Sequence, residues 1–294
     1  MITRTTSQTM LASSMRNLKS SAAAMARVQD RASSQKAISR PSDDPAATAD
    51  ALQIRAAQKA NTQFSRNIND GNGWLNTVGS ALTSTTSLLG RARDLTVQGA
   101  NDVALSDLSK EAIAKELETI RDSMLDQANT QYLGRTVFAG NSDAGHAFDS
   151  SFAFTGSPGS TVERRVNDGQ TVRVDVDGSQ AFGSGSNSIF AEVQSVIDDL
   201  RSGVNISSHL DTFDKRLQSL LGAQGQVGSR QSAMEAAESA AADRSVLLES
   251  RRAGVEDVDT AQSFMELQMQ SNVYQASLSV TAQTLQKNLM DFIR

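Results

Sequence analysis

Apolar residues recur at alternating three- and four-residue intervals near both ends of the chain, in segments with no proline and little glycine. Near the start this stripe consists of Leu11, Met15, Leu18, Ala22 and Met25. Near the end it consists of Phe264, Leu267, Ser271, Tyr274, Leu278, Thr281 and Leu285, with Leu289 and Phe292 further on. This is the seam spacing of coiled helices. It predicts a terminal helix within residues 1–42, another within 254–294, and an interface formed by their large apolar residues.

The same spacing continues toward the middle of the chain. Pro41 and Pro45 bracket a serine and the aspartate pair Asp43 and Asp44, which predicts a turn with a helix beginning close to Pro45. The apolar stripe then holds for about fifty residues, breaks near 99–102, and resumes after Ser106, a suitable N-cap. Periodic residues return from Ile189 onward. The pattern predicts two halves of a helical rod, residues 43–139 and 188–253, with the terminal helix beginning at Gly254.

Residues 140–187 have a different composition. They hold eight of the 19 glycines, one of the three prolines, and Phe148, Phe152, Phe154 and Phe182. Alternating valines on either side of Asn167-Asp168-Gly169 predict a β-hairpin. The segment is therefore expected to form a small β domain, with the phenylalanines as its core. The predicted fold class is mainly α: an elongated antiparallel helical rod with a small inserted β domain and terminal coiled-coil helices.

Charge is unevenly distributed along the chain. The formal net charge of -5 argues against a general nucleic-acid binder. Residues 1–40 hold seven basic side chains and one acidic, whereas residues 254–294 hold two basic and five acidic. These opposite signs favour pairing of the ends, within or between subunits. The alternative, that both are solvated helix faces, remains open.

Several classes of protein are disfavoured by what the sequence lacks. There is no cysteine, which excludes disulfides, thiolate metal sites and a thiol nucleophile. The first 25 residues hold no apolar run typical of a signal peptide, and no stretch approaches the roughly 18 apolar residues of a membrane span. We therefore expect a protein that neither spans a membrane nor carries a cleaved signal peptide.

Residues for catalysis or metal binding are scarce. The two histidines, His146 and His209, lack the spacing of a zinc site. Asp175-Val176-Asp177-Gly178 resembles part of a calcium loop, but Arg173 stands where the first acidic ligand is needed, so an exposed strand and turn is the favoured interpretation. No phosphate-binding loop or nucleophile elbow occurs. The sequence therefore predicts no enzyme, cofactor or metal.

The segment from Ser34 to Ala47, Ser-Gln-Lys-Ala-Ile-Ser-Arg-Pro-Ser-Asp-Asp-Pro-Ala-Ala, resembles the signature shared by flagellins and the hook-associated junction proteins of bacterial flagella. Its turn consists of Arg40, Pro41, Asp43, Asp44 and Pro45. Further matching runs are 100–102, 113–117, 129–134, 274–278 and 289–294. The resemblance covers both ends and most of the helical rod.

Within this family, Pro45, the run from Arg135 to Gly140 and the Leu-Met-Asp-Phe ending favour a junction protein over a short flagellin. Flagellins more often have alanine in place of Pro45. The Thr136-Val137 pair departs from the aromatic residue expected before Phe-Ala-Gly, so the filament subunit remains the alternative.

The resemblance implies a secreted structural protein of the bacterial flagellum, exported through the flagellar type III apparatus without a cleaved signal peptide. It implies assembly with other copies of itself between an adjacent hook-associated protein and flagellin. It also implies a cytoplasmic export chaperone that covers the C-terminal helix before assembly. The terminal helices, rich in small residues, are expected to be weakly ordered alone and to gain their burial on assembly.

Two hypotheses from other classes remain open. The heptads alone would suit a free-standing coiled-coil scaffold, which predicts a stable dimer or trimer of the purified chain. An enzyme carried by the insert would need an activity that is lost with His146. For the signature turn, a simple helix start is favoured over a subunit contact.

Overall fold

The computed structural model describes residues 7–100, 106–157 and 159–292. It divides into two compact units: unit 1 comprises residues 1–60 and 244–294, and unit 2 comprises residues 61–243. Two long helices, α2 (Pro45–Ala100) and α6 (Leu210–Glu256), contribute to both units. The fold is mainly α, as the sequence predicts.

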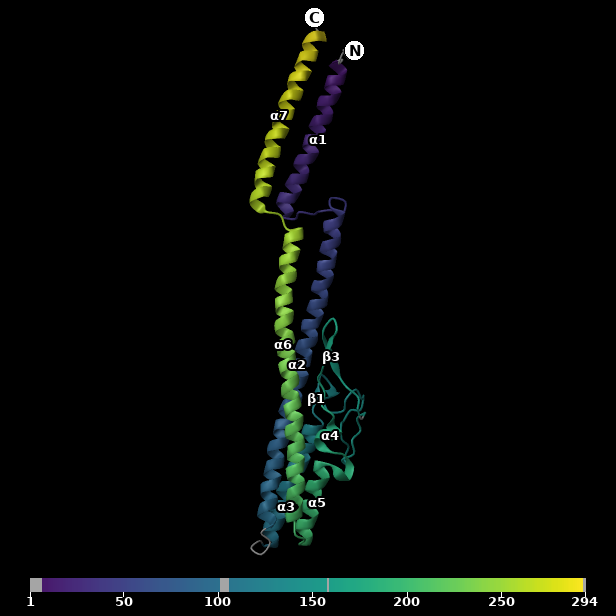
Figure 1. The fold of residues 1–294 in the computed structure, drawn as a ribbon, viewed down its shortest axis with the longest axis vertical. Coiled ribbons are helices and arrows are strands. Elements are labelled where there is room, and N and C mark those ends of the chain that lie inside the picture. The colour runs from purple at the N-terminus through teal and green to yellow at the C-terminus, as the bar shows by residue number, and fades with distance from the viewer. Residues whose placement is uncertain (1–6, 101–105, 158, 293–294) are drawn as a thin grey trace. The chain divides into compact units, whose positions relative to one another are not determined.

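Unit 1 is built around the pair of terminal helices α1 (Ser7–Ser34) and α7 (Thr260–Phe292), which lie side by side (Figure 1). They run antiparallel, because Ser21 contacts Ser277 while Arg31 contacts Glu266. The predicted start of the terminal helix at Gly254 is wrong. The preceding helix α6 continues through this glycine to Glu256, and α7 begins at Thr260.

The core of unit 2 follows the apolar stripe of α2. Every third or fourth residue from Phe64 to Thr96 is buried, including Ile68, Leu75 and Leu82. The stripe includes Gly71, where an ideal Cβ would lie 2.4 Å from Met234 Cε of α6. This glycine therefore permits the close approach of the two helices.

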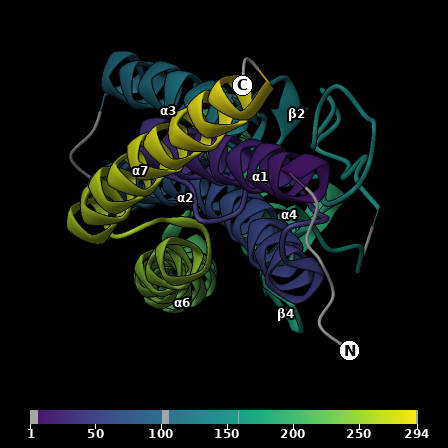
Figure 2. The same ribbon diagram turned by 90° about the horizontal axis from the view of Figure 1, so that it is seen from above.

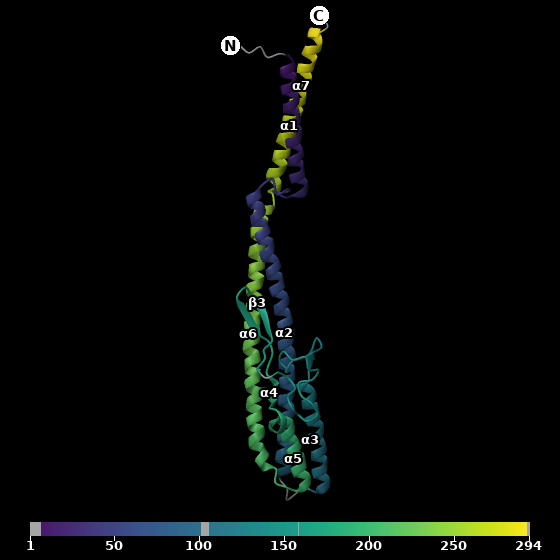
Figure 3. The ribbon, with the colours of Figure 1, turned by 90° about the vertical axis from the view of Figure 1, so that its right-hand side faces the viewer.

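Two further helices complete the helical part of unit 2. The first, α3 (Asp107–Ala128), begins after Ser106, whose hydroxyl accepts a hydrogen bond from the Ser109 N–H, as expected of an N-cap. The second, α5 (Ile189–Ser202), is capped by Ser188 and lies against α3. Figures 2 and 3 show α3 and α6 on opposite sides of α2.

The segment between α3 and α5 contains little regular structure. Strands β1 (Gln131–Tyr132) and β2 (Arg135–Thr136) form one antiparallel hairpin, and β3 (Glu163–Asn167) and β4 (Gln170–Arg173) form another. The second hairpin turns at Asp168-Gly169, where the sequence predicts it. Helix α4 (Gly178–Phe182) and short 3₁₀ turns at Gly185–Asn187 and Ser207–His209 account for the remaining regular elements of the described chain.

A cluster of phenylalanines joins this segment to the helices. The Phe148 ring centroid lies 5.4 Å from that of Phe154, 5.7 Å from Phe182 and 5.3 Å from Phe190. Since Phe190 belongs to α5, the phenylalanines form one core with the helical part of unit 2. The insert and the helices are therefore expected to unfold together.

Candidate assembly surfaces

The seam between α1 and α7 consists of small and polar residues as much as large apolar ones. On α1 it comprises Leu11, Ser14, Leu18, Ser21, Met25, Val28 and Ala32; on α7 it comprises Ser263, Leu267, Gln270, Tyr274, Ser277 and Thr281. The Ser21 and Ser277 hydroxyl oxygens are 3.3 Å apart, and Gln270 Nε2 donates to the Ser21 carbonyl. Of the described side chains in these two helices, only Ser263 and Thr281 are buried. The pair therefore buries little apolar surface and is weakly stabilised by its own contacts.

The structure brings together only some of the residues that the sequence predicts as an interface. Those half-buried in the seam are Leu11, Leu18, Met25, Leu267 and Tyr274. Those exposed to solvent are Met15 at 54%, Phe264 at 65% and Leu278 at 42%. The side chains of Leu285, Leu289 and Phe292 lie outside the described residues. Three of the large predicted residues thus flank the seam, while the other five described ones lie in it together with serine and threonine.

A second apolar stripe follows the outside of α7. It consists of Met265, Met269, Val273 and Val280, which are 45–68% exposed. At 100° per residue these positions lie roughly 120° around the helix from the seam. The single-seam interpretation of the sequence missed this stripe, although its spacing is visible when a second helical phase is tested. Helix α7 therefore presents a mixed polar and apolar face to α1 and a second, apolar face that is exposed to solvent.

Between the helices α1 and α7 themselves, the opposite charges of the chain ends form few ion pairs in the described residues. Among the described residues, the ion pair between α1 and α7 joins Arg31 to Glu266 at 4.0 Å. The side chains of Arg16, Lys19 and Arg27 are exposed on the side of α1 away from α7. This basic face is available to an acidic surface of another molecule.

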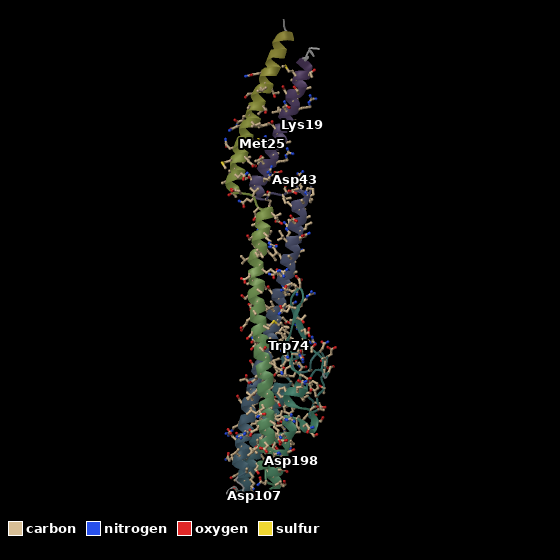
Figure 4. The ribbon with its side chains drawn as sticks, viewed as in Figure 1. Lys19, Met25, Asp43, Trp74, Asp107 and Asp198 are labelled. Atoms are coloured by element: carbon tan, nitrogen blue, oxygen red, sulfur yellow. The ribbon has the colours of Figure 1, made fainter. Side chains whose placement is uncertain are left out.

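The signature turn, in which Asp43 is labelled in Figure 4, lies just before α2. Its hydrogen bonds explain the aspartate pair. The Asp43 carboxylate accepts from the Arg40 N–H at 3.0 Å, and the Asp43 N–H donates to the Arg40 carbonyl. The Asp44 carboxylate accepts from the Ala47 N–H at 3.0 Å, so Asp44 caps a helix whose first residue is Pro45. These bonds support the helix-start interpretation of the pair.

Backbone hydrogen bonds join the two connectors beside this turn, which are residues 35–44 between α1 and α2 and residues 257–259 between α6 and α7. The Ala37 N–H donates to the Glu256 carbonyl at 2.8 Å, and the Val258 N–H donates to the Gln35 carbonyl at 3.2 Å. These bonds place Lys36 opposite Asp257 in an antiparallel bridge. The α1–α2 connector thus pairs with the α6–α7 connector across more than two hundred residues of sequence.

We call Lys36, Arg55, Arg252, Glu256 and Asp257 the connector cluster. The Glu256 side chain is 6% exposed, and its oxygens lie 2.7 Å from Arg55 Nε, 3.4 Å from an Arg252 nitrogen and 3.5 Å from Lys36 Nζ. Asp257 lies 2.6 Å from Lys36 Nζ and 3.2 Å from Arg252. The hydrogen bond from Arg55 outweighs desolvation and holds the pKa of Glu256 below its usual value of 4.5. Lys36 and then Arg252 lower the pKa of Asp257 in the same way.

Acid is expected to loosen unit 1 through this cluster. Because the pKa of Glu256 is lower in the folded state, its ion pairs stabilise unit 1 fully above the unfolded value near 4.5, and lose that contribution as pH falls through the folded value. In Glu256→Gln, hydrogen-exchange protection in α1 and α7, corrected for intrinsic rates, is expected to be lower at pH 7 and to change less between pH 7 and 4. Glu249→Gln removes a 58%-exposed carboxylate that also pairs with Arg252 and should have little effect. Equal protection in wild type and Glu256→Gln at pH 7 would show that the ion pairs of Glu256 do not stabilise unit 1.

His209, one of the two histidines considered for a zinc site, is paired with two carboxylates. Both ring nitrogens of His209 contact carboxylates, Nδ1 with Glu192 at 2.7 Å and Nε2 with Asp199 at 2.9 Å. Burial lowers the pKa of His209, but the hydrogen bonds to these carboxylates outweigh it and raise the pKa. Within the described ranges, no group of three or more histidine, cysteine or acidic side chains is arranged to hold a metal ion.

The segment that resembles part of a calcium loop uses its two aspartates for contacts within the fold. The expectation of an exposed strand is wrong for Asp175, which is buried, pairs with Arg173 at 3.0 Å and accepts from the Val162 N–H. Asp177 caps α4 by accepting from the Ser179 N–H. None of the helices in the described residues combines the length and the apolar character needed to cross a membrane.

Comparisons with known proteins match both ends of the chain. Residues 6–143 match the bacterial flagellin N-terminal helical region, and residues 210–293 match the bacterial flagellin C-terminal helical region. The flagellar hook-associated protein 3 of Salmonella typhimurium is 28% identical over 71% of this chain and 65% of its own length, so the chain spans slightly less than two thirds of that relative. The flagellin of Halalkalibacterium halodurans is 26% identical over 89% of this chain and 88% of its own length.

A solved structure shows the same fold. The structure of a putative flagellar hook-associated protein from Vibrio parahaemolyticus has a TM-score of 0.68 and 20% sequence identity, and covers 73% of this chain and all of that one. The two family regions together include α1, α2, α3, α6 and α7, which are the helices that build unit 1 and most of the core of unit 2. The chain belongs to the flagellin family, with flagellar hook-associated protein 3 among its relatives.

Proposed function

We propose that this chain is a structural protein of the bacterial flagellum that assembles at the junction between hook and filament. The observation that carries the proposal is the contrast between the units. Unit 2 has a full apolar core, whereas the α1–α7 pair buries few side chains and exposes a second apolar stripe on α7. A helix pair with unused apolar and basic faces is suited to pack against further copies.

In this proposal the assembly surface comprises the flanking residues Met15, Phe264 and Leu278, the outer stripe of α7, and the basic face of α1. The α1–α7 pair is stabilised by contacts among the half-buried seam residues, which are Leu11, Leu18, Met25, Leu267 and Tyr274. Leu285, Leu289 and Phe292, which the sequence predicts as interface residues, are also proposed to take part in assembly. Polymerisation supplies the burial that the isolated pair lacks.

We also infer that the chain is exported unfolded and meets a chaperone and other flagellar subunits. The weakly stabilised terminal helices suit passage of an unfolded chain through a narrow export channel. A cytoplasmic chaperone is expected to cover the apolar faces of α7 before export. Adjacent hook-associated protein and flagellin subunits are the expected neighbours. The proposed role is structural and requires no catalysis, cofactor, metal, nucleic acid or membrane insertion.

A flagellin filament subunit is the second candidate, and the match to the H. halodurans flagellin over 89% of this chain favours it. The match to hook-associated protein 3, Pro45 at the first position of α2 and the Leu-Met-Asp-Phe ending favour the junction.

Immunogold labelling of flagella from the source bacterium separates the two candidates. A junction protein is expected to give a single band at the distal end of the hook. Label along the whole filament would show a filament subunit, and absence from purified flagella would overturn both.

A further inference from the structure

His209 lies in the turn that joins α5 to α6. It is the last residue of the 3₁₀ turn Ser207–His209, directly before the first residue of α6. Its Nδ1 lies 2.7 Å from a Glu192 carboxylate oxygen, its Nε2 lies 2.9 Å from an Asp199 carboxylate oxygen, and both acids belong to α5. The side chains of His209 and Glu192 are only 15% and 18% exposed, so water replaces these contacts poorly. One imidazole ring therefore connects positions two helical turns apart on α5 to the start of α6.

Two carboxylates around one imidazole favour a protonated ring. A neutral imidazole has one N–H and one lone pair, so it can donate to one carboxylate while its other nitrogen faces the second carboxylate with no proton between them. An imidazolium donates to both. Although burial lowers the pKa of His209, the two hydrogen bonds and the carboxylate charges outweigh burial and raise the pKa above the ordinary value of 6.5. The geometry and the electrostatics thus favour the same charged form.

Other charged side chains close to His209 along the chain have separate environments. Asp211, in the first turn of α6, is exposed to solvent. Asp214, about one turn further along α6, pairs with Arg93 of α2 at 2.7 Å. The charges that act on His209 are those of the two α5 carboxylates, and both favour its protonated form.

The rest of the turn between α5 and α6 is held by a backbone hydrogen bond and a buried side chain. The Val204 N–H donates to the Asp199 carbonyl at 2.9 Å, so Asp199 holds the turn through both its carbonyl and its carboxylate. Ile206 is 1% exposed, and α2 approaches it at the uncharged Gly99, where an ideal Cβ would lie 2.9 Å from Ile206 Cδ1. Since Val204 is 53% exposed, opening of the turn would change an apolar part of the surface of unit 2.

We propose that His209 is a pH-sensitive clasp, which as an imidazolium joins α5 to the start of α6 and on losing its proton loosens the turn of residues 203–209. Loss of the proton leaves one carboxylate without a hydrogen-bond donor in a poorly hydrated place. Because the pKa of folded His209 lies above the unfolded value near 6.5, the clasp stabilises the turn fully below pH 6.5 and loses that contribution as pH rises through the folded value. The clasp lies within unit 2 and does not depend on the proposed function.

Proton NMR and hydrogen exchange test the clasp in the full chain. The C2 proton of His209 is expected to titrate at higher pH in the native chain than in the same chain unfolded in urea, and His146→Gln assigns its resonance by removing the other histidine. Exchange of the amides of residues 203–209, corrected for intrinsic rates, is expected to accelerate by up to about tenfold per pH unit above pH 6.5, until the folded ring is neutral. Titration of His209 at the same or a lower pH in the native chain would overturn the proposal.

Glu192→Gln separates a pH-sensitive clasp from an ordinary helix contact. The glutamine amide can donate to Nδ1 of a neutral ring whose Nε2–H donates to Asp199, so the turn should stay closed and its corrected exchange should no longer depend on pH. Asp198→Asn is the matched control, because Asp198, labelled in Figure 4, is an exposed α5 carboxylate that accepts from Gln194 at 2.9 Å. This control should keep the pH dependence of the wild type. Undiminished pH dependence in Glu192→Gln, or its loss in Asp198→Asn, would overturn the proposal.

Discussion

Deletion of residues 1–34 or of residues 260–294 is expected to abolish assembly while leaving unit 2 folded. The large buried side chains of unit 2 lie within residues 61–243, and of the described side chains of α1 and α7 only Ser263 and Thr281 are buried. Losing either helix therefore removes little apolar burial from the stable core, but it removes one side of the proposed assembly surface. Motility of the complemented bacterium should be lost in both deletions.

The fluorescence of Trp74 follows the folding of unit 2 separately from that of the terminal helices. It is the single tryptophan of the chain and is 1% exposed in unit 2, so its fluorescence reports on that unit. Its thermal transition should stay within about 2 °C of wild type, which corresponds to less than roughly 1 kcal/mol for a unit of this size. Loss of that transition in the truncated chains would mean that the terminal helices belong to the monomer core. As a milder comparison, Phe264→Ala should leave the transition unchanged.

Phe148→Ala is expected to destabilise unit 2 by about 3–5 kcal/mol, because it leaves a cavity among three other aromatic rings. The side chain is 1% exposed and contacts rings from the insert and from α5. A loss of that size lowers the melting temperature by roughly 10 °C. Trp74 fluorescence and far-UV circular dichroism should report the shift.

The same substitution tests whether the insert is separate from the helices. If they share one core, Trp74 on α2 should melt in a single transition at the lowered temperature, although Phe148 lies far from it in sequence. Phe264→Ala is the control, since this phenylalanine is 65% exposed in unit 1. An unchanged Trp74 transition in Phe148→Ala would show that the insert unfolds on its own.

The helical stripe of α2 could be predicted because it is long and its apolar residues are buried in one continuous core. Pro45, Ser106 and the Asn-Asp-Gly turn mark boundaries through local chemistry, and each lies where the structure begins or reverses an element. The β1–β2 hairpin was not predicted, since Leu133 stands where asparagine would have marked the turn. The end of α6 was misplaced because a single glycine, Gly254, does not end a helix.

The arrangement of the terminal helices was harder to predict. Apolar periodicity selects the largest side chains, whereas the seam also contains small polar residues such as Ser21, Ser263 and Ser277. The connector cluster joins Arg55 to Glu256, which are 201 positions apart, and nothing local in the sequence indicates that pairing. Buried Asp175 was missed for the same reason, because its burial depends on tertiary contacts with Arg173 and Val162.

The outer apolar stripe of α7 is expected to become buried between copies on assembly. The chain has no cysteine, so Met269→Cys introduces a single thiol on that stripe, at a position 63% exposed in the structure. The monomer is expected to be labelled rapidly by maleimide, and intact flagella are expected not to be labelled over the same time. Asp168→Cys, at the exposed β3–β4 turn, should label in both states. Equal labelling of Met269→Cys in monomer and in motile, assembled flagella would show that the stripe is not buried between copies.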